Sequence, residues 1–349
     1  DVTETPSATA DAYKNESDVS IITGIIQEQR QKGASVSEDL DNTEQYIWKD
    51  GRLVEIHWAE SYVGGELDMS GLTALESLNC SNGWLSSLNV SKNAALRTLS
   101  CYESQLRSLD VSKNTALTYL DCNNNVLNSL DVSKNTELTY LDCFWTQISS
   151  LDVSKNMALE ELDCCETQLS SLDVSKNIAL EKLDCSNNDQ LRSLDVSKNV
   201  ALTSLVCNRN QLSSLDVSKN TALTSLDCSI NHQLSSLDVS KNTALESLKC
   251  SLNQLSSLDV SKNMVLTYLD CGSNQLSSLD VSKNIALTYL DCADNQLSSL
   301  DVNKNTKLTD LYCSFNRLSS LDVSKNTELE NLSYDNTVTV IGKENTKLN

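Results

Sequence analysis

A hexapeptide that returns at a nearly constant interval is the feature that most restricts how this chain can fold. The interval is 21 residues, except for two steps of 22, whose extra residues are best placed in turns at Asp189 and His232. Variants of the hexapeptide begin at Leu67, Leu88 and Leu300. A unit this short cannot bury its own apolar side, so the copies must stack on one another. Exact copies of LDVSKN begin at Leu109, Leu130, Leu151, Leu172, Leu194, Leu215, Leu237, Leu258, Leu279 and Leu321.

Each period contains two halves with a similar skeleton. The period that begins at Leu117 reads LTYLDCNNNVL and then NSLDVSKNTE. In an extended segment, the Leu and Cys of L-x-C lie on one side and x lies on the other, so stacked copies predict a ladder of short parallel strands. Counting a degenerate copy from Leu53, in which Ile56 and Trp58 take the Leu and Cys places, we expect fourteen coils.

The pattern LxxLxCxxNxL resembles the leucine-rich-repeat signature, and the nested 21-residue form resembles the bacterial subclass called IRREKO. The resemblance covers about residues 53–337. It implies a right-handed leucine-rich-repeat solenoid, a β/α-type horseshoe or a rod, with short parallel β-strands, an extended second face and little helix outside an N-terminal cap. It also implies a binding scaffold without catalysis, although the fold alone does not identify a ligand.

Two rows of asparagine are expected to point inward and to satisfy backbone groups at the turns. The second-half row is Asn93, Asn114, Asn135, Asn156, Asn177, Asn199, Asn220, Asn242, Asn263, Asn284, Asn305 and Asn326. The first-half row is Asn125, Asn188, Asn210, Asn231, Asn253, Asn274, Asn295 and Asn316.

Twelve of the thirteen cysteines occupy one repeat place, where the second half has Val or Met69. Because Val and Cys exchange there, we predict a stack of small, buried thiols. Disulfides between coils are the alternative, but the side chains should point in parallel rather than toward each other. No CxxC spacing exists, so no metal site is predicted. The twelve are Cys80, Cys101, Cys122, Cys143, Cys164, Cys185, Cys207, Cys228, Cys250, Cys271, Cys292 and Cys313.

Cys165 is the thirteenth cysteine and follows Cys164 directly. It should therefore point outward, either as the one reactive thiol or as an incidental surface residue.

Charged side chains also form rows. Each exposed ion pair contributes little to stability, so we predict a solvated surface with charges of both signs. The alternative is that the rows of carboxylates bind calcium, although the sequence contains no DxDxDG loop. The second-face rows include Asp110 and Lys113 and repeat through Asp322 and Lys325. The first-face row is Asp121, Asp142, Asp163, Asp184, Asp227, Asp270 and Asp291.

Composition excludes several functions. The net charge is −21, whereas nucleic-acid recognition needs a basic face. No apolar run approaches the roughly 18 residues of a membrane span. The two histidines, His57 and His232, lie eight coils apart and cannot share one centre. We therefore expect no nucleic-acid partner, no cofactor and no catalytic residue.

The chain ends lack the repeat. Residues 1–16 are polar and uneven and are interpreted as a disordered tether. Residues 17–66 predict a cap made of a helix, with Ser17 as its N-cap, and a hairpin around Lys49-Asp50-Gly51. The repeats occupy 67–337, and residues 338–349 should cover the last coil. The helix should bury Ile21, Ile22, Ile25 and Ile26, and the hairpin should leave Trp48 or Trp58 over the end of the core.

The sequence begins with Asp1 rather than Met and shows no signal peptide. We interpret this as a trimmed precursor of a bacterial protein that is secreted or held at the cell surface by an N-terminal lipid anchor.

The outward places of the first half differ from coil to coil, whereas the second half is almost constant. Side chains that the repeat does not require can vary from coil to coil, so this face can recognise a partner. Exposed aromatic residues are also typical of interfaces. Neutral drift of duplicated repeats is the alternative interpretation. The candidate patch is Tyr102, Tyr119, Tyr140, Phe144, Trp145, Glu166 and Arg209.

Together these features predict a monomeric, non-enzymatic binding module at the cell surface or outside the cell. It would recognise a protein or a glycan through the variable LxxLxC face. The alternative is a structural or adhesive spacer without a specific ligand. A carboxylate-based hydrolase is a remote further alternative, because pairs of carboxylates recur in successive coils.

Overall fold

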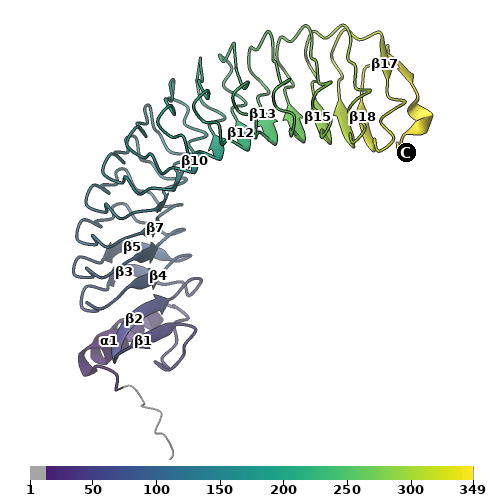
Figure 1. The fold of residues 1–349 in the computed structure, drawn as a ribbon. Coiled ribbons are helices and arrows are strands. Elements are labelled where there is room, and N and C mark those ends of the chain that lie inside the picture. The colour runs from purple at the N-terminus through teal and green to yellow at the C-terminus, as the bar shows by residue number, and fades with distance from the viewer. Residues whose placement is uncertain (1–12, 349) are drawn as a thin grey trace, which may run out of the picture. The chain divides into compact units, whose positions relative to one another are not determined.

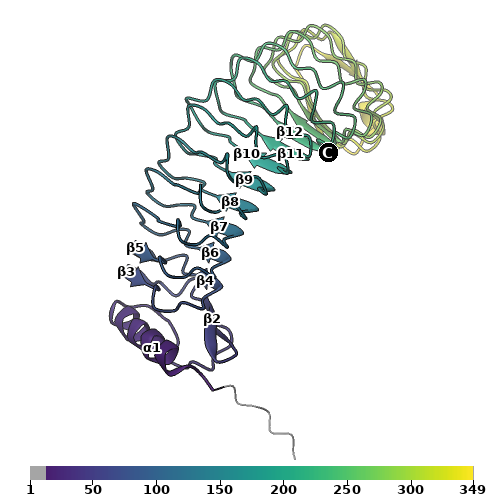
Figure 2. The same ribbon diagram turned by 60° about the vertical axis from the view of Figure 1, so that its left-hand side comes forward.

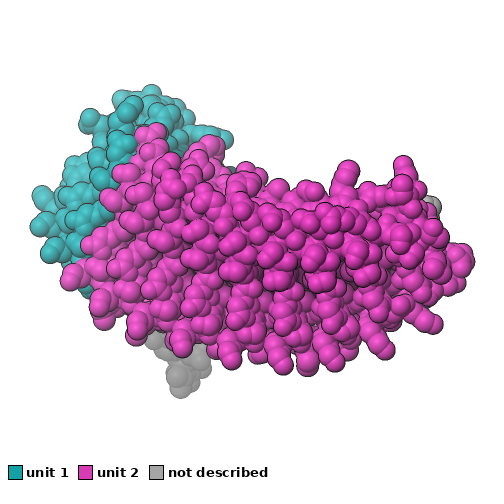
Figure 3. All heavy atoms as spheres, turned by 90° about the horizontal axis from the view of Figure 1, so that it is seen from above, with its two compact units in different colours: residues 1–142 teal, residues 143–349 magenta. Residues whose placement is uncertain are grey.

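The computed structural model describes residues 13–348, and the statements below concern that part of the chain. It forms two compact units that divide between Asp142 and Cys143 (Figure 3). Most of the predicted tether lies outside the described residues.

The first unit begins with a single α-helix, α1 (Glu16–Gln31). Its N-cap is Asn15, whose Oδ1 accepts hydrogen bonds from the backbone N–H groups of Ser17 and Asp18, both at 3.1 Å. The prediction of Ser17 as the N-cap is therefore wrong, because the extended Asn15 backbone lets its amide reach the first free N–H groups.

The buried side of α1 is narrower than predicted. Ile22 and Ile26 are buried, while Ile21 and Ile25 are only half-buried. The helix lies beside strand β3 (Figure 2), which it joins through a hydrogen bond from Gln29 Nε2 to the carbonyl of Gly64.

A hairpin follows the helix as predicted. Strands β1 (Tyr46–Lys49) and β2 (Arg52–His57) pair in antiparallel fashion. Asp50 and Gly51 both have positive φ angles, of 50° and 77°, as a two-residue type I′ turn requires. Trp58 is the tryptophan that fills the core here; it is fully buried and donates from Nε1 to the Tyr46 hydroxyl at 3.3 Å.

The remaining strands of the first unit stack coil on coil (Figure 1). One parallel ladder runs β2-β4-β6-β7-β8, and a second pairs β3 with β5. Their bounds are β3 (Gly64–Asp68), β4 (Ser77–Asn79), β5 (Trp84–Asn89), β6 (Thr98–Ser100), β7 (Tyr119–Asp121) and β8 (Tyr140–Asp142).

The second unit continues the same pattern. Its parallel ladder runs in chain order from β9 to β16 and ends with β18, while β17 pairs with β19 on the other side of the last coil. The bounds are β9 (Glu161–Asp163), β10 (Lys182–Asp184), β11 (Ser204–Val206), β12 (Ser225–Asp227), β13 (Ser247–Lys249), β14 (Tyr268–Asp270), β15 (Tyr289–Asp291), β16 (Asp310–Tyr312), β17 (Ser320–Asp322), β18 (Asn331–Ser333) and β19 (Thr339–Ile341). A 3₁₀ turn, η1 (Lys343–Asn345), follows β19.

These observations confirm the predicted fold class, a parallel solenoid with a ladder of short strands on one side and a mostly extended second side, where only β3, β5, β17 and β19 form strands within the described residues. The register is also as expected, because Ile56 of the degenerate first copy pairs with Leu78 of the next coil. Within the described residues α1 is the only α-helix. The division into tether, caps and repeats stays a prediction.

The inward rows hold the coils together as predicted. In the second-half row, Asn114 Nδ2 donates to the carbonyls of Val90, at 3.0 Å, and Asn93, at 2.9 Å, in the preceding coil. In the first-half row, Asn274 Nδ2 donates to the carbonyls of Cys250 and Cys271. In the second-half row the amide adds a second hydrogen bond to carbonyls that already accept a backbone N–H, such as those of Val90 and Asn93.

All twelve ladder cysteines are buried free thiols, which confirms the predicted stack. Burial raises the pKa of ladder thiols such as Cys101 and Cys80, and that of Cys80 rises to about 12. The thiols therefore stay protonated and act as small apolar groups.

The outward orientation predicted for Cys165 is wrong, because the residue is only 8% exposed. The in-out alternation of a strand ends at Cys164, where the chain enters a turn and Glu166 adopts a φ of 50°. The Ser186 hydroxyl of the next coil then lies 3.0 Å from the Cys165 sulfur.

The first-face aspartates are less solvated than predicted. Asp121 and Asp142 are both buried, and Asn123 Nδ2 donates to both carboxylates, at 2.8 and 2.9 Å. Burial, with a smaller contribution from Asp142, raises the pKa of Asp121 to about 7.

The second-face aspartates behave in the opposite way. The backbone N–H of Ser112 donates to Asp110 Oδ1 at 2.9 Å, and the same turn recurs along the row. Hydrogen bonding from Ser112 lowers the pKa of Asp110, and Lys113 contributes less. The local turn, more than the lysine row, stabilises these carboxylates.

Candidate binding surface

The turn after the cysteine ladder has one conformation in every coil. The residue two places after each ladder cysteine has a φ between 49° and 56°, in the left-handed region that side chains other than Asn and Asp avoid. The stack imposes this conformation through hydrogen bonds such as Trp145 N–H to the carbonyl of Cys165, 3.0 Å. The twelve residues are Asn82, Glu103, Asn124, Trp145, Glu166, Asn187, Arg209, Ile230, Leu252, Ser273, Asp294 and Phe315.

Because the backbone is the same at each of these turns, only the side chain differs from coil to coil. In the second unit, four successive turns carry Trp145, Glu166, Asn187 and Arg209. They line one open hollow of about 590 Å³. Three of the seven predicted patch residues therefore meet here.

The hollow combines an aromatic surface with polar groups of both signs. Trp145 is 60% exposed, and its ring lies 6.2 Å from that of Phe144 at an angle of 47°. Within the described chain, neither Glu166 nor Arg209 forms an ion pair, so both charged ends are available to a ligand. Sequence comparison of the coils missed the rest of the lining, which is Thr146, Gln147, Thr167, Gln168, Asn187 and Asp189.

Asp189 belongs to this lining because its coil is one residue longer. The extra residue shifts the local hydrogen bonds: Leu191 N–H donates to the carbonyl of Asn188 at 2.8 Å, and Asn188 N–H donates to Asn210 Oδ1 at 2.9 Å. The predicted place of the insertion is thus confirmed.

Of the other four predicted residues, Phe144 lies beside Trp145, and three lie in the first unit. Tyr119 and Tyr140 begin β7 and β8 and stack face to face, with ring centroids 4.3 Å apart and planes at 6°. The Tyr102 hydroxyl accepts a hydrogen bond from Asn82 Nδ2 at 3.4 Å. The tyrosine pair forms an aromatic surface on the strand side, and Tyr102 belongs to the turns.

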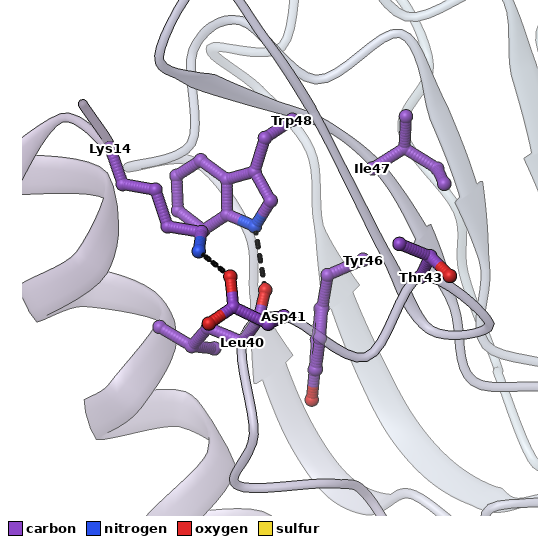
Figure 4. Close-up of a pocket in the computed structure, with 7 residues that line it drawn as sticks. All are labelled: Lys14, Leu40, Asp41, Thr43, Tyr46, Ile47 and Trp48. Carbon is purple, nitrogen blue, oxygen red and sulfur yellow. Dashed lines mark hydrogen bonds and ion pairs between the residues drawn. The ribbon is translucent and has the colours of Figure 1, made fainter. Parts of the chain in front are cut away.

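A second hollow, of about 470 Å³, lies beside the hairpin in the first unit (Figure 4). Trp48 Nε1 donates to the carbonyl of Leu40 at 3.0 Å, and Lys14 pairs with Asp41 while its ammonium lies 5.6 Å from the Trp48 ring centre. Its polar groups are thus already engaged with one another, which makes it a weaker candidate than the hollow of the second unit.

Three side chains lie as close together as metal ligands do, a grouping that the repeat spacing did not indicate. The ligand atoms of Asp163, Cys165 and Asp184 lie within 4.8 Å of one another. The thiol is engaged by the Ser186 hydroxyl at 3.0 Å and by Asn187 Nδ2 at 3.6 Å. Burial raises the pKa of Cys165. We interpret the group as a hydrogen-bonded cluster around a protonated thiol.

The stacked coils and their buried thiols have a counterpart among solved structures. The functional domain of InlJ from Listeria monocytogenes, which includes a cysteine ladder, is 37% identical to this chain with a TM-score of 0.73. The match covers 82% of this chain and 68% of that one. The chain belongs to the bacterial leucine-rich-repeat proteins.

Two further solved structures share the leucine-rich-repeat fold at lower identity. The protein LIC12759 from Leptospira interrogans is 21% identical, with a TM-score of 0.73, over 90% of this chain and 88% of that one. The Arabidopsis receptor kinase HAESA is 18% identical, with a TM-score of 0.67, over 93% and 66%. No protein-family model and no curated protein matches the chain. None of the described helices has the length and apolarity needed to cross a membrane.

Proposed function

We propose that this leucine-rich-repeat protein is a non-enzymatic binding module that engages a protein or a glycan at the turns after the cysteine ladder. The observation that carries the proposal is the convergence of Trp145, Glu166 and Arg209 on one hollow. Exposed aromatic side chains beside unpaired charges of both signs are typical of recognition surfaces.

The scaffold favours this use because its backbone does not depend on these side chains. Residues as different as Trp145, Glu166 and Arg209 occupy the same turn with nearly the same φ, so the surface can change without loss of the fold. The HAESA structure holds a peptide hormone and a co-receptor, which supports the idea that this fold can present such a surface.

The proposal is tested with immobilised surface-protein extracts and with a glycan array. Trp145→Ser and Arg209→Ala should weaken capture of the same ligand while the circular dichroism spectrum stays unchanged. Phe315→Ser is the matched control, because Phe315 is exposed at the equivalent turn position eight coils after Trp145 and lies outside the hollow. Equal capture by wild type and the Trp145 variant would exclude this hollow.

A spacer without a specific ligand is the second candidate, and it predicts no saturable binding in either assay. A hydrolase would require a reachable pair of carboxylates. The pair Asp121 and Asp142 is buried and bridged by Asn123. The carboxylates of Asp163 and Asp184 lie within 4.8 Å of each other and of the buried Cys165 thiol. Both arrangements favour a structural role.

We further propose that the protein acts at the bacterial cell surface or outside the cell. Fractionation of the producing cells, with protease treatment of intact cells, tests this location. Recovery of the protein only from the cytoplasm would contradict it.

A further inference from the structure

A second surface lies at the other turn of each coil, directly after the second-half asparagine row. In the second unit this place is apolar and exposed in two groups of coils. Met157, Ile178 and Val200 occupy three successive coils and are 61%, 62% and 56% exposed. Met264 and Ile285 occupy two later successive coils and are each 60% exposed, and Val265 adjoins them. We call these residues the aliphatic row.

The fold does not require aliphatic side chains at this place. The coils between and after the two groups have Thr221, Thr243, Thr306 and Thr327 there, and these coils have the same asparagine hydrogen bonds. Successive coils lie about 4.8 Å apart, so aliphatic side chains on neighbouring coils form continuous apolar strips. Exposed strips of this kind mark interaction surfaces in soluble proteins.

Opposite charges border the row where the first group lies. The chain crosses this turn roughly at right angles to the stacking direction, so residues before and after the row lie on opposite sides of it. Exposed Lys155 and Lys176 stand two residues before Met157 and Ile178, and exposed Glu160 and Glu181 stand three residues after them. The row is thus basic along one side and acidic along the other.

We propose that the aliphatic row is a self-association surface, on which a second copy of this chain docks about a two-fold axis that runs along the row. Such an axis places each aliphatic residue against its own counterpart and each threonine against a threonine. It also exchanges the two sides, so that the lysines of one copy face the glutamates of the other. An anionic lipid surface fits less well, because the acidic residues and the net charge of −21 oppose it.

The proposal goes beyond the binding function, because the row lies half a coil away from the turns that carry Trp145. The two can fail separately: a variant that loses self-association can still capture a ligand at the hollow.

Sedimentation velocity over a wide concentration range tests the proposal with the full chain. Wild type should show a reversible monomer–dimer equilibrium. The triple variant Ile178→Thr, Met264→Thr, Ile285→Thr should raise the dissociation constant roughly tenfold or more, because it removes three of the six apolar side chains of the row from each copy. These substitutions insert the residue that other coils already have, so folding should be preserved. Phe315→Ser, which removes an exposed aromatic from the opposite turn, should leave the equilibrium unchanged.

Cysteine cross-linking tests the axis. With oxidised glutathione added as the oxidant, Ile178→Cys should form a disulfide between two copies, because the residue would meet its own counterpart, whereas the thirteen native thiols are buried. A wild-type protein that stays monomeric at every concentration overturns the proposal. So does a dimer that the triple variant does not weaken, or one that Phe315→Ser weakens equally. Binding of wild type to anionic vesicles without self-association would assign the row to a lipid surface instead.

Discussion

Replacing Thr167 by Asn should stabilise the second unit. Thr167 holds a place that is asparagine in most coils, and its hydroxyl lies 2.9 Å from the carbonyl of Cys164 and 2.7 Å from Asn188 Oδ1. A hydroxyl has one hydrogen, so it can satisfy only one of these acceptors fully. It also leaves the backbone N–H of Ile148 without a hydrogen-bond acceptor among the described residues.

The size of the effect follows from coils that keep the asparagine. Asn274 Oδ1 accepts the N–H of Leu255 at 2.9 Å, in the place equivalent to Ile148, while its Nδ2 bonds two carbonyls. A buried N–H without a partner costs about 1–3 kcal/mol. Loss of the threonine methyl group offsets about 0.8 kcal/mol of that gain. The net stabilisation should be about 0.2–2 kcal/mol.

Two measurements check this. Guanidinium unfolding should show a higher midpoint for Thr167→Asn, and hydrogen exchange should show slower exchange of the Ile148 amide. Hydrogen exchange is the more direct test, since repeat proteins can unfold in parts. Asn274→Thr is the matched reverse variant and should cost a similar amount, with faster exchange at Leu255.

The reasoning is refuted if Asn274→Thr destabilises as expected while Thr167→Asn is neutral and leaves Ile148 exchange unchanged. That result would mean that the chain around Thr167 has adapted to the hydroxyl.

Three further predictions follow from single coils. Ile230→Asn should stabilise by about 1 kcal/mol in thermal unfolding, because a β-branched residue is costly at a φ of 56° and asparagine tolerates it; no gain would contradict the strain argument. Because the folded-state pKa of Asp121 is raised to about 7, the folded state binds more protons than the unfolded state, and stability should fall as pH rises from about 4 to 7. Asp121→Asn should remove this loss, so its advantage in unfolding free energy over wild type should grow across that window; a constant difference would be contrary evidence. Ellman titration should find no rapidly reacting thiol in the native protein, Cys165 included, and thirteen after denaturation; one fast thiol, abolished by Cys165→Ser, would show that Ser186 does not shield it.

The repeat alone predicted the stacking register, because a fixed period leaves each coil only one way to pair with the next. The period places Ile56 opposite Leu78, and the two residues pair in the structure. Because Val and Cys occupy the equivalent places of the two halves of the repeat, the sequence also identified the buried thiols. The asparagine rows followed for the same reason, since an inward polar residue in a solenoid can be satisfied only by the turns beside it.

The candidate patch was predicted less completely. Comparison of coils selected Trp145, Glu166 and Arg209, and these do line one hollow. It also selected Tyr102, which bonds Asn82 instead, and it missed Asn187, which looks like an ordinary ladder residue in sequence. The sequence does not single out the aliphatic row, because a Met or Ile after LDVSKN reads as part of the apolar pattern.

What the sequence determined by itself was therefore everything that depends on the period: the fold, the buried rows and the number of coils. What only the tertiary structure decided was the direction of side chains where the chain leaves the strand. Strand alternation stops there, and the next coil, not the local sequence, fixes the turn at a positive φ. The Cys165 thiol is therefore covered by the Ser186 hydroxyl of the next coil. Asp121 and Asp142, at the ends of their strands, are buried beside Asn123. Four unlike side chains at equivalent turns line one hollow.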